Sequence, residues 1–112
     1  MIRGTTPTIK LYVDGCDLTG MRFFITLCDK KNDQKFTYDN TMSNVELISA
    51  SSEQSQINLT LSQDETLALA VGKVEIQVRW VDQAGIAYAT DIATIDVSKI
   101  LLDKKINFGG IV

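Results

Sequence analysis

Short segments in which every second residue is apolar run through most of this chain, and they restrict it to β-structure. In residues 74–80, apolar side chains occupy one face while Glu75, Gln77 and Arg79 occupy the other. Because successive side chains of a strand point to opposite sides, this period predicts a strand with one buried face. The same pattern predicts strands at residues 8–13, 21–27, 35–38 and 57–61, and a weaker one at 45–48.

One short helix is predicted between two of these strands. Ser62 and Glu65 have the spacing of a capping box, in which the side chain of each residue bonds the backbone N–H of the other. This spacing predicts a helix over residues 65–70, ended by Gly72. A helix of about two turns is too short to be stable alone. We therefore expect a connector that closes one end of the sheet structure.

The last long strand changes its apolar phase partway along. Residues 82–85 predict a hairpin turn, and the return strand is expected over residues 86–97. Tyr88 and Ile92 fall in one register, whereas Ala93 and the apolar residues after it fall in the other. One extra residue produces such a shift, so a bulge or bend is predicted near Ile92.

Together these segments predict a mainly all-β fold, an antiparallel immunoglobulin-like β-sandwich with one short connector helix. The polar alternate faces favour antiparallel sheets, because buried parallel strands are continuously apolar. The length suits a single domain over residues 1–112, with an N-terminal arm at 1–7 and a C-terminal arm at 103–112. Trp80 is expected to fill the core, and the polar run at residues 49–56 to be an exposed loop or strand edge.

Charge and hydropathy argue against two classes of partner. The net charge of −3 and the isolated lysine pairs at 30–31 and 104–105 do not provide the concentrated basic face that nucleic acid requires. The sequence also lacks an apolar run of about 18 residues, and its start has no apolar stretch of secretory length. We expect no nucleic-acid partner, no membrane partner, and a soluble protein that stays where it is made.

The residue types argue against catalysis. The chain has no histidine, which is the commonest general base near neutral pH and a frequent metal ligand. No glycine-flanked nucleophile elbow is present, and the aspartates lack the spacing of a calcium loop, so they are interpreted as turn formers and caps. We expect no enzyme, no catalytic residues, no metal and no cofactor. Cys16 and Cys28 are expected to be free thiols, with a disulfide as the alternative.

The two ends carry the strongest indication of function. Both place groups outside the predicted sandwich that would gain from docking on a neighbour, for example by strand addition to a sheet edge. The alternative is that both ends are frayed. The candidate interface comprises Ile2, Arg3, Thr5, Thr6, Pro7, Phe108, Ile111 and Val112.

Part of the sequence resembles a known group of proteins. Positions 1–8 read Met-Ile-Arg-Gly-Thr-Thr-Pro-Thr, and this start resembles that of short prophage structural proteins of Gram-positive bacteria. The same group is similar over residues 61–67, 72–80, the turn at 82–85, and 89–97. More distantly, the passage of strand, short helix, glycine and strand is similar to the N-terminal domain of siphophage baseplate upper proteins. The likeness covers roughly two thirds of the chain and leaves residues 29–56 unmatched.

The resemblance implies a phage or prophage virion protein, a tail, baseplate or neck component built from repeated copies, with no catalytic residues to carry over. Its partners would be other virion proteins and copies of itself. It would be made in the bacterial host cytoplasm and end in the virion. A second hypothesis is a monomeric module that decorates a capsid or binds carbohydrate through the loops at residues 29–35 and 49–56.

Overall fold

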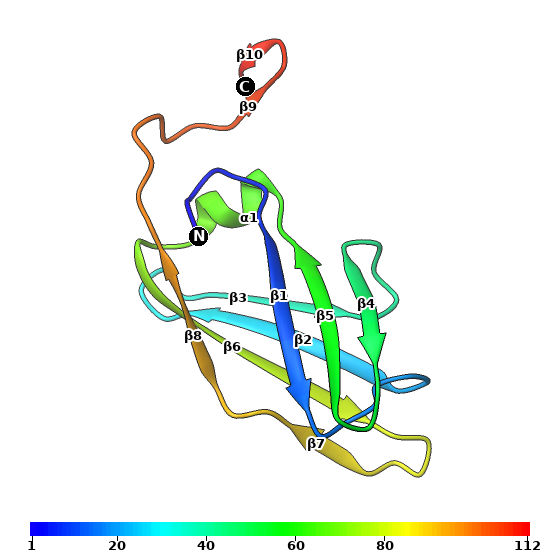
Figure 1. The fold of residues 1–112 in the computed structure, drawn as a ribbon. Coiled ribbons are helices and arrows are strands. Elements are labelled where there is room, and N and C mark those ends of the chain that lie inside the picture. Colours follow the sequence, from blue (N-terminus) through cyan, green and yellow to red (C-terminus); the bar gives the residue numbers. More distant parts are fainter.

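The structure, a computed structural model, describes residues 1–112 and contains two antiparallel β-sheets that face each other, with their strands running across one another (Figure 1). The smaller sheet has the order β1-β5-β4, from β1 (Thr8–Asp14), β5 (Gln54–Thr60) and β4 (Val45–Ala50). The larger sheet has the order β3-β2-β6-β7 with β8 also on β6, from β3 (Gln34–Asp39), β2 (Arg22–Asp29), β6 (Gly72–Val81), β7 (Ala87–Ala89) and β8 (Ala93–Val97). The predicted all-β antiparallel sandwich with one short helix is confirmed.

The strand order differs from that of an immunoglobulin constant-type domain. In an immunoglobulin constant-type domain, the second strand lies in the same sheet as the first, fourth and fifth. Here β2 lies in the other sheet, between β3 and β6. The chain therefore has the two-sheet architecture that the sequence predicts, with its own assignment of strands to sheets.

A core of sixteen buried apolar side chains fills the space between the sheets. The alternating positions of β6 supply Val74, Ile76, Val78 and Trp80, which is 8% exposed. Opposite them lie buried residues of β1 and β5, including Val13, Ile57 and Leu59. Each such side chain stabilises the fold by about 1.5–3 kcal/mol when it leaves water. Trp80 fills the core as predicted, and its ring stacks on Tyr88 with 5.7 Å between the ring centroids.

The predicted bulge lies between β7 and β8. Arg79 pairs with Ala89 and Ile76 pairs with Ala93, so two residues of β6 oppose three of the edge strand. The extra residue is accommodated at Thr90, whose N–H donates to the Val78 carbonyl at 2.9 Å while its Oγ1 accepts from the Val78 N–H at 3.1 Å. This extra residue shifts the alternation of side chains along the edge strand by one position. Ala93 therefore faces the same side of the sheet as Ile76.

The polar run at residues 49–56 is mostly strand. β4 extends to Ala50 and β5 begins at Gln54, which leaves only a tight turn between them. Two features hide the apolar period here. Ser55 takes a core position, fully buried, where its hydroxyl donates to the Cys16 carbonyl and accepts from the Leu18 N–H. In β4, the pairing register also shifts between residues 47 and 49.

The capping box starts the helix α1 (Gln63–Ala68) as predicted, but the end of the helix differs from the prediction. Ser62 Oγ accepts from the Glu65 N–H at 3.2 Å, and Glu65 Oε1 accepts from the Ser62 N–H at 2.9 Å. The helix begins two residues earlier than expected, and the chain is already extended at the fully buried Leu69. Gly72, with φ of 127°, starts β6 and does not end the helix. Burial of Leu69 in the core therefore determines where the helix stops.

Side chains from distant segments satisfy the carbonyl groups that the helix leaves unpaired at its C-terminal end. Arg3 donates from Nη2 to the Leu67 carbonyl at 2.6 Å and from Nε to the Leu69 carbonyl at 2.8 Å. Asn32 Nδ2, from the β2–β3 turn, donates to the Ala68 carbonyl at 3.0 Å. Such a short helix depends on contacts of this kind, because its own hydrogen bonds are too few to sustain it.

Asp29 joins the β2–β3 turn to the segment after the helix. Its carboxylate is 1% exposed and accepts from the N–H groups of Lys31 and Asn32 through Oδ1, and from that of Ala70 through Oδ2 at 2.6 Å. A buried carboxylate that accepts from three backbone donors is a structural group, because its own oxygens are satisfied only in this arrangement of turn and segment.

Replacement of Asp29 by alanine should therefore lower the free energy of unfolding by roughly 2–4 kcal/mol, since it leaves three backbone donors without their acceptor. Urea denaturation followed by circular dichroism measures the change. Lys30→Ala, in the same turn, is the control: its ion pair with Glu75 is exposed and should contribute far less. Equal losses in the two variants would contradict this role for Asp29.

Tyr38 should give the fold a dependence on alkaline pH. Burial and a hydrogen bond that the Tyr38 hydroxyl donates to the Glu65 carboxylate raise the pKa of Tyr38 well above its ordinary value of 10.0. The unfolded chain loses this proton near pH 10, while the folded chain retains it. The contribution of Tyr38 to the free energy of unfolding is therefore fully present below pH 10 and decreases above it. Between pH 9 and pH 11 the wild-type urea midpoint should fall more than that of Tyr38→Phe. Parallel curves would exclude this linkage.

Candidate functional site

The C-terminal arm, residues 103–112, stands apart from the sandwich (Figure 1). It forms a hairpin of two very short strands, β9 (Ile106–Asn107) and β10 (Gly110–Ile111), closed by a bond from the Val112 N–H to the Lys105 carbonyl. Its apolar side chains have almost no cover: Phe108 is fully exposed, Ile111 is 62% exposed and Val112 is 66% exposed. Phe108 lies in the turn of the hairpin, whereas Ile111 lies on the returning strand and Val112 lies at the base beside Lys105.

Polar contacts hold the base of the arm to the domain. The side-chain amide of Gln63 donates to the Ile106 carbonyl at 2.7 Å and accepts from the Ile106 N–H at 3.0 Å, as a neighbouring strand would. Lys105 Nζ lies 3.0 Å from Asp64 Oδ2. The arm therefore leaves the domain beside the first turn of α1 in a defined direction, with Phe108 of its turn in solvent.

The N-terminal residues of the predicted interface bind their own domain. Arg3 reaches the carbonyl groups at the end of α1 and places Nη1 2.9 Å from Asp103 Oδ2. Ile2 bridges to Ser98, and the Thr5 carbonyl accepts from Thr66 Oγ1 at 2.8 Å. Pro7 likewise accepts through its carbonyl from the Leu61 N–H at 3.0 Å. Of the five predicted N-terminal residues, Ile2 and Thr6 are exposed. The structure thus separates the predicted interface into a bound N-terminal segment and a projecting arm.

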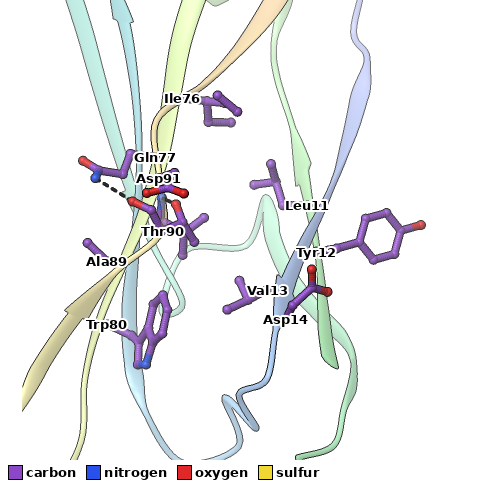
Figure 2. A pocket seen from close by; sticks show the side chains of 12 residues that line it. Leu11, Tyr12, Val13, Asp14, Ile76, Gln77, Trp80, Ala89, Thr90 and Asp91 are labelled. Atoms are coloured by element: carbon purple, nitrogen blue, oxygen red, sulfur yellow. Dashed lines mark hydrogen bonds between the residues drawn. The ribbon is translucent and has the colours of Figure 1, made fainter. Parts of the chain in front are cut away.

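A groove of about 430 Å³ opens between β1 and the bulged edge of the larger sheet (Figure 2). Leu11 and Val13 of β1 point into it, and Ile76 and Trp80 of β6 lie across from them. β1 is the last strand of its sheet, so one row of its backbone groups has no strand partner along this groove. The sequence predicted the strands on both sides, but nothing in it marked the opening between them.

The polar groups at this groove are few and mostly engaged. Gln77 donates through Nε2 to the Thr90 carbonyl at 2.8 Å, and Asp14 accepts from Gln54 Nε2 at 2.7 Å. Asp91 forms no ion pair and no side-chain hydrogen bond, so its carboxylate is free at the rim. No group of three or more His, Cys, Asp or Glu side chains could hold a metal ion. Chemically, the groove offers an apolar floor, an open strand edge and an acidic rim.

The two cysteines are free thiols, as the sequence predicted. Burial, and then the nearby carboxylate of Asp17, raise the pKa of the Cys16 thiol above its ordinary value. Since the thiolate is the reactive form, this environment makes Cys16 less reactive at neutral pH.

The loops of the carbohydrate-binding hypothesis lie at different ends of the smaller sheet. The β2–β3 turn binds the end of α1 through Asn32, and α1 follows the C-terminal end of β5. The β4–β5 turn lies at the other end of β5, where the Glu53 carbonyl accepts from the Gly15 N–H at 2.7 Å. The two loops therefore do not form one joint surface.

Comparison with protein-family models, curated proteins and solved structures found no match. The one helix of the chain is far too short to cross a membrane. The functional interpretation of the arm and groove therefore rests on the chemistry of the two surfaces and on the sequence resemblance described above.

The Gln63 contact generates a test of how the arm is held. Gln63→Ala removes both hydrogen bonds to Ile106, so residues 106–112 should become more mobile and be cleaved faster by chymotrypsin at Phe108. The control for loss of an amide side chain is Gln56→Ala, at a half-buried position of β5 away from the arm. Cleavage at the same rate in wild type and Gln63→Ala would show that Gln63 does not hold the arm.

Proposed function

We propose that this chain is a structural protein of a bacteriophage or prophage virion, a tail, baseplate or neck component that makes subunit contacts through its C-terminal arm. Its partners in this proposal are copies of itself and other virion proteins, and its place is the virion after synthesis in the bacterial host. The resemblance of residues 1–8 and of the second half to phage structural proteins supports the phage assignment. The arm supports the contact role.

The single observation that carries the contact role is the set of exposed apolar residues on the arm. Exposed apolar residues scattered singly are ordinary on protein surfaces, but a projecting cluster is typical of an interaction site. Phe108, Ile111 and Val112 are three exposed apolar residues within five consecutive positions of a projecting segment that adds no side chain to the core. Their exposure gives the isolated domain no stability, whereas their burial against a neighbour would stabilise an assembly.

The expected strength of one arm contact favours repeated assembly. Burial of three such side chains contributes roughly 5–9 kcal/mol at about 1.5–3 kcal/mol each. Loss of translational and rotational freedom opposes association by about 4–15 kcal/mol. A single arm therefore gives a weak contact in dilute solution. Many copies held in one particle raise the effective concentration and make the same contact persistent.

Deletion of residues 103–112 should leave a folded monomer, because the deleted segment contributes nothing to the core. Sedimentation velocity at high protein concentration should show concentration-dependent oligomers for the wild type and none for the truncated chain. Phe108→Ser combined with Ile111→Ser should give the same loss at full length.

The matched control is Met42→Ser, which removes an exposed apolar side chain from the domain itself and should leave association unchanged. A truncated chain that forms the same oligomer as the wild type would refute the arm model. A wild type that stays monomeric and binds glycan or capsid surfaces would favour the capsid-decoration or carbohydrate-binding hypothesis instead.

A further inference from the structure

We propose that the groove between β1 and the β7–β8 edge of one copy receives the C-terminal arm of a second copy. This inference rests on the proposed subunit-contact function and names both its partner and its acceptor site. Each chain then carries one donor segment, the arm, and one acceptor site, the groove, on different parts of its surface. Four observations support the match: the shape of the acceptor, the form of the donor, their opposite charges, and the distance between them in one chain.

The acceptor offers the surface that an extended segment requires. The unpaired edge of β1 can form main-chain hydrogen bonds, and the apolar floor beneath it can receive alternate side chains. The bulge at Thr90 supplies the space, because it interrupts the edge strand opposite Leu11 and Val13. Ala93 is exposed on the wall of this opening and is small enough to leave it clear.

The donor is suited to leave its hairpin. Two residues per strand and no side chain in the core make this hairpin only marginally stable. In an extended form, Ile106 and Phe108 fall on one face and Asn107 on the other, the alternation that a strand edge beside an apolar groove selects. Gly109 and Gly110 follow and let the chain turn before the last apolar residues.

The charges of donor and acceptor are complementary. Residues 103–112 contain two lysines and one aspartate, a net charge of +1, and the whole chain has −3, so residues 1–102 carry −4. Lys104 forms no ion pair within the chain, and Asp91 is equally unpaired at the groove. Attraction between these groups would speed the encounter and orient the arm toward the groove.

The occupant is a second copy because the arm is held away from the groove of its own domain. Gln63 and Arg3 fix its base beside α1, beyond the end of the smaller sheet where β1 begins. The groove lies along residues 11–14, at the other end of β1. That strand spans about 20 Å at roughly 3.3 Å per residue. Contact between different surfaces of identical chains propagates from copy to copy and closes into a ring or continues as a filament.

The test uses two variants that are each blocked on one side. Ala93→Arg fills the groove and retains the arm, whereas deletion of residues 103–112 removes the arm and retains the groove. Each alone should be monomeric by sedimentation velocity. Mixed in equal amounts, they should form a 1:1 heterodimer that grows no further. The arm of Ala93→Arg binds the groove of the truncated chain, and no second arm–groove pair remains.

The matched control is Thr94→Arg, which adds the same charge one residue away on the opposite face of β8 and should associate like the wild type. Asp91→Lys should weaken association about threefold to tenfold at low salt. It should not change the fold, because the Asp91 carboxylate is exposed and has no partner in the chain. Circular dichroism confirms that each variant is folded.

The outcomes distinguish the two proposals. In one outcome, arm deletion abolishes association, but folded Ala93→Arg and Asp91→Lys associate like the wild type. This result would overturn the groove as the acceptor site and would leave the proposed function of the arm intact. A mixture of the two blocked variants that remains monomeric would also overturn it. Unchanged association on arm deletion would instead refute the proposed function itself.

Discussion

The apolar face of β6 is the surface on which the other elements depend. β6 pairs with β2 on one side and with β7 and β8 on the other, so it fixes the register of the whole larger sheet. Its four inward side chains also form the floor against which β1 and β5 pack. Since a slip of one residue would turn every one of these side chains outward, the period of this strand determines the fold.

The bulge at Thr90 has two structural effects. It returns the apolar residues of β8 to the core side after β7, and it interrupts the sheet edge beside β1. The backbone remains satisfied because Thr90 and Gln77 supply the missing bonds. Irregularities that stay fully hydrogen-bonded are stable features of a sheet edge and not local defects. The opening beside β1 therefore borders a fully hydrogen-bonded irregularity of the sheet edge.

The sequence predicted most of the strands because their inward residues are apolar and regularly spaced. It predicted the bulge for the same reason, through the change of phase near Ile92. It gave little information where a polar residue takes a core position, as Ser55 does, because the alternation disappears although the strand persists. The helix end was misplaced because burial of Leu69 prevailed over the local signal of Gly72.

The candidate site was predictable only in part. Exposed apolar residues near the end of the chain identified the arm, since such a pattern is visible in the sequence itself. The binding of residues 1–7 to the domain was not predictable, because it depends on Arg3 meeting carbonyl groups more than sixty residues away. The groove arises from the separation of two strands of different sheets, and no sequence pattern encodes that separation.

The double hydrogen bond between Gln63 and Ile106 bears on the conformational entropy of assembly. A wholly flexible tail would lose on the order of 1–2 kcal/mol of backbone entropy for each residue ordered on docking. Here the residues up to Ile106 are already restrained in the free chain, so only the tip remains to be ordered. In the proposed arm contact, more of the free energy of burial would therefore be retained as affinity than with a wholly flexible tail of the same composition.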